Sequence, residues 1–222
     1  MKMPLILVLV CISITISCKS DDPEPGGPSS NTYMTMTAGS SRSYELKNNT
    51  PPTSTTNYTV TSTNRDTAVN GRTYRVFSTS TGGSEYYAQS GSDYYTYQIL
   101  PIAIGTTNVE ILFLKDNAAV GTTWVAASAP LTVPGVPFPL TITINNTIAA
   151  KGLSKTVNGK NYTDVIQVNS TIGVAGLPGG VSSDIQYFYA PKYGLIENSV
   201  ILSSTLAPIA VDTDTRLMTA NF

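Results

Sequence analysis

The 222-residue chain contains no histidine, and that absence excludes several kinds of site at once. Ser-His-Asp and Cys-His catalytic groups need an imidazole as their general base. Many zinc sites use histidine nitrogens as ligands, and histidine is the side chain that titrates near neutral pH. We therefore expect none of these catalytic groups, no His-ligated metal and no histidine pH switch.

Cysteine is almost as rare, because the only two cysteines are Cys11 and Cys18, close to the N-terminus. Residues 19–222 have no thiol and therefore no disulfide. A chain of this length can bury roughly 70% of the surface that its unfolded form exposes, which is enough for one domain without such a cross-link. The hydrophobic core has to supply the stability.

Charged residues are also scarce, at 12% of the chain, with 13 cationic and 14 acidic side chains. Nucleic-acid-binding domains usually concentrate Lys and Arg in a patch, and no such run is present. The chain also lacks a P-loop, a dinucleotide-binding glycine motif and a nucleophile elbow. We therefore expect no nucleic-acid partner, no cofactor and no metal.

A long apolar run occurs only at the N-terminus, where Lys2 precedes the segment from Leu5 to Ile16. A cation followed by an apolar run shorter than the ~20 residues that span a bilayer predicts a signal peptide. Ser17 and Cys18 end this run and resemble the lipobox of bacterial lipoproteins, although Thr15 departs from the Leu, Val or Ile usual at its position. The alternative is a plain secretory signal with an incidental cysteine.

The lipobox resemblance implies that residues 1–17 are removed and that acylated Cys18 anchors the protein to a membrane. The following Lys19-Ser20-Asp21-Asp22 resembles the export tag of Bacteroidota surface lipoproteins, which implies an outer-membrane location facing the cell exterior. A solvated acidic spacer is the alternative interpretation. Because residues 18–32 are rich in Pro, Gly and Ser, we expect a flexible tether there, followed by one β domain over residues 33–222.

The remaining sequence has the period of β-strands and little sign of helix. The segment 140–145 alternates apolar and polar residues, as a half-buried strand does. Asn70-Gly71 and Asn158-Gly159 each lie between strand-like segments, and this dipeptide favours two-residue hairpin turns. We therefore predict an all-β fold built from an antiparallel meander.

Three segments recur in the same order, which indicates an internal duplication over about 36–115 and 117–211. The paired segments are 38–44 with 119–124, 69–74 with 157–162, and 85–88 with 187–190. Coincidence among common turn sequences is the alternative. We expect four or five strands per half, with long loops at Ser128–Pro139 and Gly173–Ser183. The two halves should curl into a single barrel, half-barrel or sandwich-like domain.

Two further segments bear on the fold. Val109–Leu114 is apolar on both strand faces, which predicts a strand covered on both sides, either a central strand under a loop or one at a cavity wall or partner. The segment Phe188–Ile196 is similar to an aromatic-rich closing hairpin. The body of the chain thus resembles uncharacterised calycin-like or half-barrel lipoproteins of Bacteroidota.

Tyrosine, with 13 copies, is the overused side chain that is best suited to ligand contact. Exposed aromatic rings stack on sugars and apolar ligands, and their hydroxyls add polar contacts, although tyrosine is also a common strand residue. Alternation places Tyr95 and Tyr97 on one strand face and Tyr94 on the other. The candidate ligand platform consists of Tyr86, Tyr95, Tyr97, Trp124, Tyr187 and Tyr189.

We consider three functions. The first is a non-enzymatic binding protein for an apolar small molecule or a glycan, which a cavity larger than about 300 Å³ would favour. The second is a structural or assembly lipoprotein that presents a β surface to a protein partner, which an uncovered apolar patch would favour. The third and least favoured is a carboxylate hydrolase, which requires two acidic side chains facing one cleft. The candidate carboxylates are scattered singly: Glu85, Asp93, Glu110, Asp116, Asp164, Asp184 and Glu197.

Overall fold

The computed structural model describes residues 32–102, 105–131, 140–176, 180–204 and 210–222. The predicted signal peptide, Cys18 with its predicted lipid attachment, and the predicted tether up to residue 31 lie outside these residues. Asn31–Phe222 forms one compact unit. Among the described residues, none belongs to a helix long and apolar enough to cross a membrane.

The described residues form one antiparallel sheet of 12 strands, which confirms the predicted all-β meander. Consecutive strands pair from β1 to β6 and from β7 to β12, and β12 returns to pair with β1. The strands are β1 (Ser41–Asn48), β2 (Ser54–Val69), β3 (Arg72–Thr79), β4 (Ser84–Ser90), β5 (Asp93–Ile102), β6 (Gly105–Lys115), β7 (Thr123–Leu131), β8 (Leu140–Val157), β9 (Lys160–Ala175), β10 (Ser182–Ala190), β11 (Gly194–Ser203) and β12 (Ala210–Asn221).

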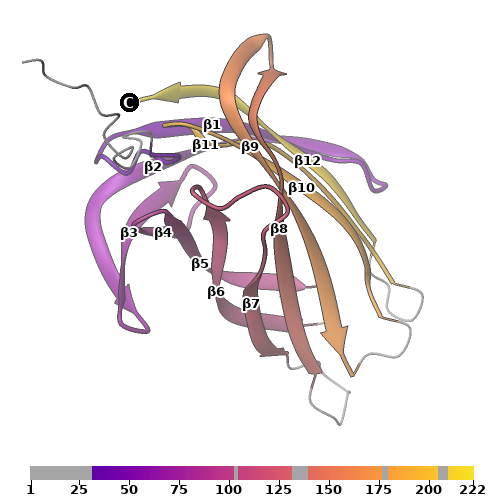
Figure 1. Cartoon of the computed structure of the whole chain (residues 1–222). Coiled ribbons are helices and arrows are strands. Elements are labelled where there is room, and N and C mark those ends of the chain that lie inside the picture. Colours follow the sequence, from indigo (N-terminus) through magenta and orange to yellow (C-terminus); the bar gives the residue numbers. More distant parts are fainter. Residues whose placement is uncertain (1–31, 103–104, 132–139, 177–179, 205–209) are drawn as a thin grey trace, which may run out of the picture. The chain divides into compact units, whose positions relative to one another are not determined.

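The sheet curls until its two end strands, β6 and β7, lie next to each other, so that it is barrel-like and nearly closed (Figure 1). Within the described ranges, no backbone ladder joins β6 to β7. We call this junction the seam. The sequence expectation of a barrel, half-barrel or sandwich is therefore met by a barrel-like sheet with one unpaired seam.

The three recurring sequence segments occupy equivalent places in the two six-strand halves. The first pair lies at the start of β1 and just before β7, the second spans the β2–β3 and β8–β9 turns, and the third lies in β4 and β10. Each half has six strands, more than the four or five expected. The duplication itself stays a prediction from the sequence.

The long loops expected at Ser128–Pro139 and Gly173–Ser183 are shorter than predicted, because β7 extends to Leu131 and β9 to Ala175. Residues 132–139 and 177–179, where the rest of these loops was expected, lie outside the described residues.

Strand alternation follows the predicted pattern in β8, where Leu140, Ile142 and Ile144 are buried at alternate positions. Two clusters of buried side chains fill the inside of the sheet. The larger one gathers residues of both halves, including Tyr44 and Phe77 from the first and Ile166 from the second. The smaller one joins β6, β7 and β8. Phe113 and Trp124 pack against both clusters and so connect them.

Both predicted Asn-Gly turns have positive φ at both positions, with φ of 51° and 79° at Asn70 and Gly71 and 48° and 78° at Asn158 and Gly159. This is the backbone that tight hairpins of this class require. Asn158 also donates from its amide to the Leu217 carbonyl at 2.8 Å, which ties the β8–β9 turn to β12.

Gly159→Ala is expected to lower the free energy of unfolding by roughly 1–2 kcal/mol, because a left-handed backbone disfavours any Cβ. An added Cβ would meet nothing within 4 Å, so the cost comes from the backbone conformation alone. Gly173→Ala is the matched control, since its Cβ is equally free of contacts and it lies within β9 without positive φ. Urea unfolding should show a loss for Gly159→Ala and no loss for Gly173→Ala; equal losses would contradict the explanation.

Candidate functional site

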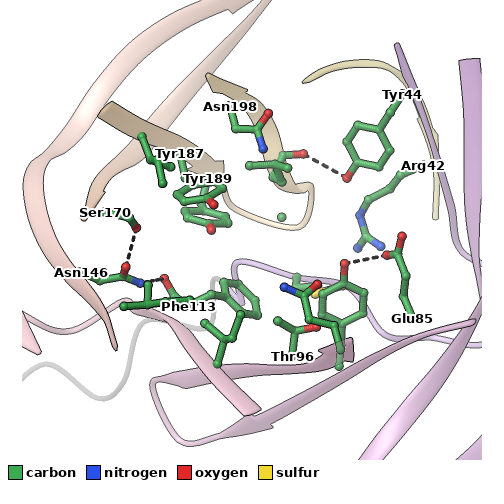
Figure 2. A pocket seen from close by; sticks show the side chains of 18 of the residues that line it. Arg42, Tyr44, Glu85, Thr96, Phe113, Asn146, Ser170, Tyr187, Tyr189 and Asn198 are labelled. Atoms are coloured by element: carbon green, nitrogen blue, oxygen red, sulfur yellow. Dashed lines mark hydrogen bonds between the residues drawn. The ribbon is translucent and has the colours of Figure 1, made fainter. Parts of the chain in front are cut away.

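The inside of the curled sheet holds a cavity of about 300 Å³, located where the two core clusters meet (Figure 2). Its wall comes from strands of both halves, including β1, β4, β6, β8, β9 and β10. The volume is at the threshold set for a binding protein and at the lower end of the 300–1,000 Å³ range typical of ligand sites. The core is therefore not completely filled.

Aromatic rings form most of the frame of this cavity. Tyr44 and Tyr58 stack with ring centroids 5.4 Å apart, and Tyr187 and Tyr189 stack at 6.2 Å. Phe113 lies 5.4 Å from the ring of Tyr189, so β6 and β10 meet across the cavity. Such ring pairs hold their members in fixed positions, which gives the cavity a defined shape.

One end of the cavity is polar because it contains Arg42, which is only 2% exposed. Its Nε donates to the Tyr193 carbonyl at 2.6 Å, and Nη2 donates to the carbonyls of Thr35 at 2.7 Å and Lys192 at 3.3 Å. The guanidinium also lies over the rings of Phe77 and Phe222, 5.9 and 5.5 Å from their centroids. Burial lowers the pKa of Arg42 below its usual range.

Glu85 lies at the same end and lines the cavity with Arg42 (Figure 2). Its Oε2 accepts a hydrogen bond from the Tyr87 hydroxyl at 2.7 Å. Burial raises the pKa of the Glu85 carboxyl, and the hydrogen bond from Tyr87 and the positive charge of Arg42 oppose this rise only in part. The negative charge is therefore costly for the folded state.

Glu85→Gln is expected to stabilise the protein at pH 7. The folded-state pKa of Glu85 is raised, so stability is greatest below the unfolded pKa of about 4.3 and falls as pH rises through the folded pKa. Because the glutamine amide does not ionise, Glu85→Gln avoids this loss of stability. Its gain over wild type should therefore shrink as the pH falls towards 4. Urea midpoints at pH 4 and pH 7 measure the stability gain of Glu85→Gln over wild type. Glu45→Gln is the control, because the Glu45 carboxylate lies outside the cavity lining. A Glu85→Gln protein that is less stable than wild type at pH 7 would contradict the assignment.

The opposite end of the cavity contains a second polar group, the pair Asn146 and Ser170 (Figure 2). The Ser170 hydroxyl donates to the Asn146 side-chain oxygen, and the Asn146 amide donates to the Phe113 carbonyl at 3.3 Å. Because Phe113 is on β6 and Asn146 on β8, this contact crosses the seam. Both side chains are buried and have hydrogen-bond partners, so they hold the wall rather than offer free groups.

The six residues of the predicted platform do not lie together. Tyr187 and Tyr189 line the cavity. Tyr86 and Tyr97 alternate with the cavity-lining residues of β4 and β5, so they point to the other face of the sheet, as does Tyr95. Trp124 lies at the seam, where its indole N–H donates to the Leu112 carbonyl at 2.8 Å.

The tyrosines on the other face form a cluster around an ion pair. Arg72 lies over the Tyr95 ring, 3.4 Å from its centroid, and pairs with Glu110 at 3.1 Å. Tyr74, which is fully buried, also donates a hydrogen bond to Glu110. Tyr86 and Tyr97 line a second hollow of about 560 Å³ that shares Glu85, Tyr87, Thr96 and Gln98 with the cavity. Its lining is the more polar of the two.

Sequence reasoning missed several cavity residues, most importantly Arg42, Tyr44 and Phe113. One usable signal was that Arg42 lies two residues before Tyr44. In a strand this spacing places the guanidinium on the same, buried face as the tyrosine ring. Phe113 belongs to the segment 109–114, for which a cavity wall was one of the alternatives. The alternative of a central strand is wrong, because β6 is at the end of the sheet order.

Of the seven candidate carboxylates, Glu85 alone lines the cavity or the second hollow among the residues that the structure describes. Asp93 and Glu110 form ion pairs with Lys115 and Arg72, at 3.0 and 3.1 Å. The pair of acidic side chains facing one cleft that glycoside hydrolysis requires is therefore not formed by these residues.

No family model matches this chain, and its sequence matches no curated protein. Its fold is similar to that of a Bacteroides fragilis protein described as exported and as having a YmcC-like fold, with a TM-score of 0.50 and 8% sequence identity over 85% of this chain and 98% of that one. A second solved structure, described as a lipoprotein of Parabacteroides distasonis, gives a TM-score of 0.48 at 7% identity, over 86% and 99% of the two chains. At such low identity the first similarity establishes a shared fold.

Proposed function

We propose that this protein is an exported, lipid-anchored binding protein that holds an apolar or amphipathic small molecule inside its curled sheet and performs no catalysis. The observation that carries this proposal is the 300 Å³ cavity framed by aromatic and aliphatic side chains. Small-molecule sites are mostly concave and apolar with a few polar groups, and this cavity has that composition. The second hollow is a weaker candidate because its lining is more polar.

The location is proposed from the N-terminal sequence. The apolar run ending at Ser17-Cys18 supports acylation of Cys18, and Lys19 to Asp22 supports display on the outer membrane, facing outward. The exported protein of similar fold is consistent with this assignment. Labelled palmitate should be incorporated into the wild-type protein and not into Cys18→Ala; a labelled Cys18→Ala protein would contradict it.

Ligand binding can be tested with N-phenyl-1-naphthylamine, a neutral apolar fluorophore that brightens in an apolar site. The mature chain (residues 18–222, with Cys18→Ser to keep it free of lipid) should bind the fluorophore at one saturable site. Ile172→Trp places a larger ring in the cavity and should reduce binding at least about tenfold, since a filled pocket excludes its ligand.

Thr171→Trp is the matched control for this test. Thr171 is exposed and alternates with Ser170 and Ile172, which line the cavity, so it faces away. The Thr171→Trp protein should therefore bind the fluorophore with the same affinity as wild type. No saturable binding, or equal loss in both variants, would reject the cavity as the site and leave a surface that contacts a protein partner as the alternative.

A further inference from the structure

The polar end of the cavity has an unused hydrogen-bond donor. An arginine guanidinium carries five N–H groups, and Arg42 uses Nε and Nη2 on three backbone carbonyls. Its Nη1 has no hydrogen-bond partner among the described residues, although the side chain is 98% buried. Figure 2 shows this guanidinium directed towards the cavity beside Glu85.

The same end also has an unused acceptor. Glu85 accepts the Tyr87 hydrogen bond on Oε2, while Oε1 accepts none from the described residues. Arg42 and Glu85 are close enough to influence each other's pKa, yet no ion pair within 4.0 Å joins them in the part of the chain that the structure describes. A donor and an acceptor therefore face the same space without satisfying each other.

Charge in the cavity is balanced. Arg42 and Glu85 are the two charged side chains in its lining, as far as the described residues show, and their charges cancel. An anion that approached Arg42 would be repelled by Glu85, and a cation that approached Glu85 would be repelled by Arg42. A buried site with this arrangement favours a neutral polar group over either ion.

Between this end and the Asn146–Ser170 pair, whose polar groups already have hydrogen-bond partners, the wall is suited to hydrocarbon. Phe113 and the stacked rings of Tyr187 and Tyr189 are followed by aliphatic side chains from β6, β8, β9 and β10. The aliphatic lining residues from these four strands are Ile111, Ile144, Ile172 and Ile185. In Figure 2, Tyr187 lies at the end of the cavity opposite Arg42 and Glu85.

We propose that the cavity selects a neutral amphiphile with a hydroxyl head group, whose oxygen accepts from Arg42 Nη1 and whose hydrogen is donated to Glu85. A hydroxyl is both donor and acceptor, so one group satisfies both side chains. The hydrocarbon part of the ligand extends along Phe113 towards Tyr187. This inference rests on the proposed binding function and specifies the chemical class of its ligand.

Three probes that share a ten-carbon chain test the inference by displacement of N-phenyl-1-naphthylamine from the mature chain at pH 7. 1-Decanol carries a donor and an acceptor, methyl decanoate only acceptors, and decanoate a negative charge. We expect 1-decanol to bind at least about tenfold more tightly than decanoate, with methyl decanoate weaker than the alcohol, because a site built for a hydroxyl rejects analogues that leave its polar groups unpaired.

Glu85→Gln separates head-group recognition from simple apolar binding. The amide keeps the shape of the side chain and an acceptor but removes the negative charge, so decanoate should gain at least about tenfold while 1-decanol changes less. Decanoate that equals or exceeds 1-decanol in the wild type, or an unchanged ratio in Glu85→Gln, would overturn the inference while leaving the binding function intact. Absence of fluorophore binding would reject the binding function, and this inference with it.

Discussion

Arg42→Met is expected to lower the free energy of unfolding by about 3 kcal/mol or more, because it removes charge-assisted hydrogen bonds to buried backbone carbonyls. Methionine fills much of the space of the arginine stem but cannot donate. The carbonyls of Tyr193 and Thr35 would lose their Arg42 donors, whereas the Lys192 carbonyl keeps the Thr35 amide at 3.1 Å. In a domain of this size the loss corresponds to a fall in Tm of about 6–12 °C.

The expected effect is large because Arg42 connects three parts of the chain. β1 contributes the side chain, the segment before β1 contributes Thr35, and the β10–β11 turn contributes Lys192 and Tyr193. Arg65→Met is the control, since Arg65 is exposed on β2 and its side chain makes no hydrogen bond or ion pair with the described residues. Its effect should stay within about 0.5 kcal/mol. Similar urea midpoints for the two variants would show that Arg42 does not hold these segments together.

Trp124→Ala is expected to cost about 3 kcal/mol, the lower end of the range for large-to-small aromatic substitutions, because Trp124 is partly exposed. Trp124 packs against both core clusters and donates its indole N–H across the seam to Leu112. Backbone hydrogen bonds join all the other pairs of adjacent strands in the sheet. The seam therefore relies on side chains such as Trp124 and Asn146.

Two further variants divide this effect into its parts. Trp124→Phe keeps an aromatic ring but removes the N–H donor, and should cost about 1 kcal/mol. Val125→Ala, at a neighbouring side chain that is 59% exposed, should have little effect. Chemical unfolding of the three proteins measures the series. A Trp124→Ala protein as stable as Val125→Ala would contradict the role of Trp124 in closing the sheet.

The parts of the fold that sequence predicts are those set by local backbone chemistry. Asn70-Gly71 and Asn158-Gly159 require positive φ wherever they form a hairpin turn, and both do. The alternation in residues 140–145 fixes which side chains of β8 are buried. These features depend only on residues close together in the chain, so composition and period are sufficient to find them.

The cavity depends on distant contacts and could not be derived in this way. Arg42 on β1 meets Glu85 on β4 only because the intervening strands curl. Register shifts add to the difficulty, since one lies between Tyr94 and Tyr95 and another between Phe188 and Tyr189. A bulge changes which residues share a face. Opposite Tyr94 and Tyr95 the extra residue is Phe113 of β6, so Phe113 and its neighbour Leu114 both face the inside of the sheet, which simple alternation could not predict.

The most direct test of ligand binding inside the sheet is methyl NMR of protein labelled at isoleucine δ1 and titrated with N-phenyl-1-naphthylamine. We expect shift changes and ligand NOEs at the isoleucines that line the cavity: Ile111, Ile144, Ile172 and Ile185. Ile201, which is 44% exposed, should not respond. Changes confined to Ile201 or to other surface methyls, with the four cavity methyls unaffected, would contradict the claim.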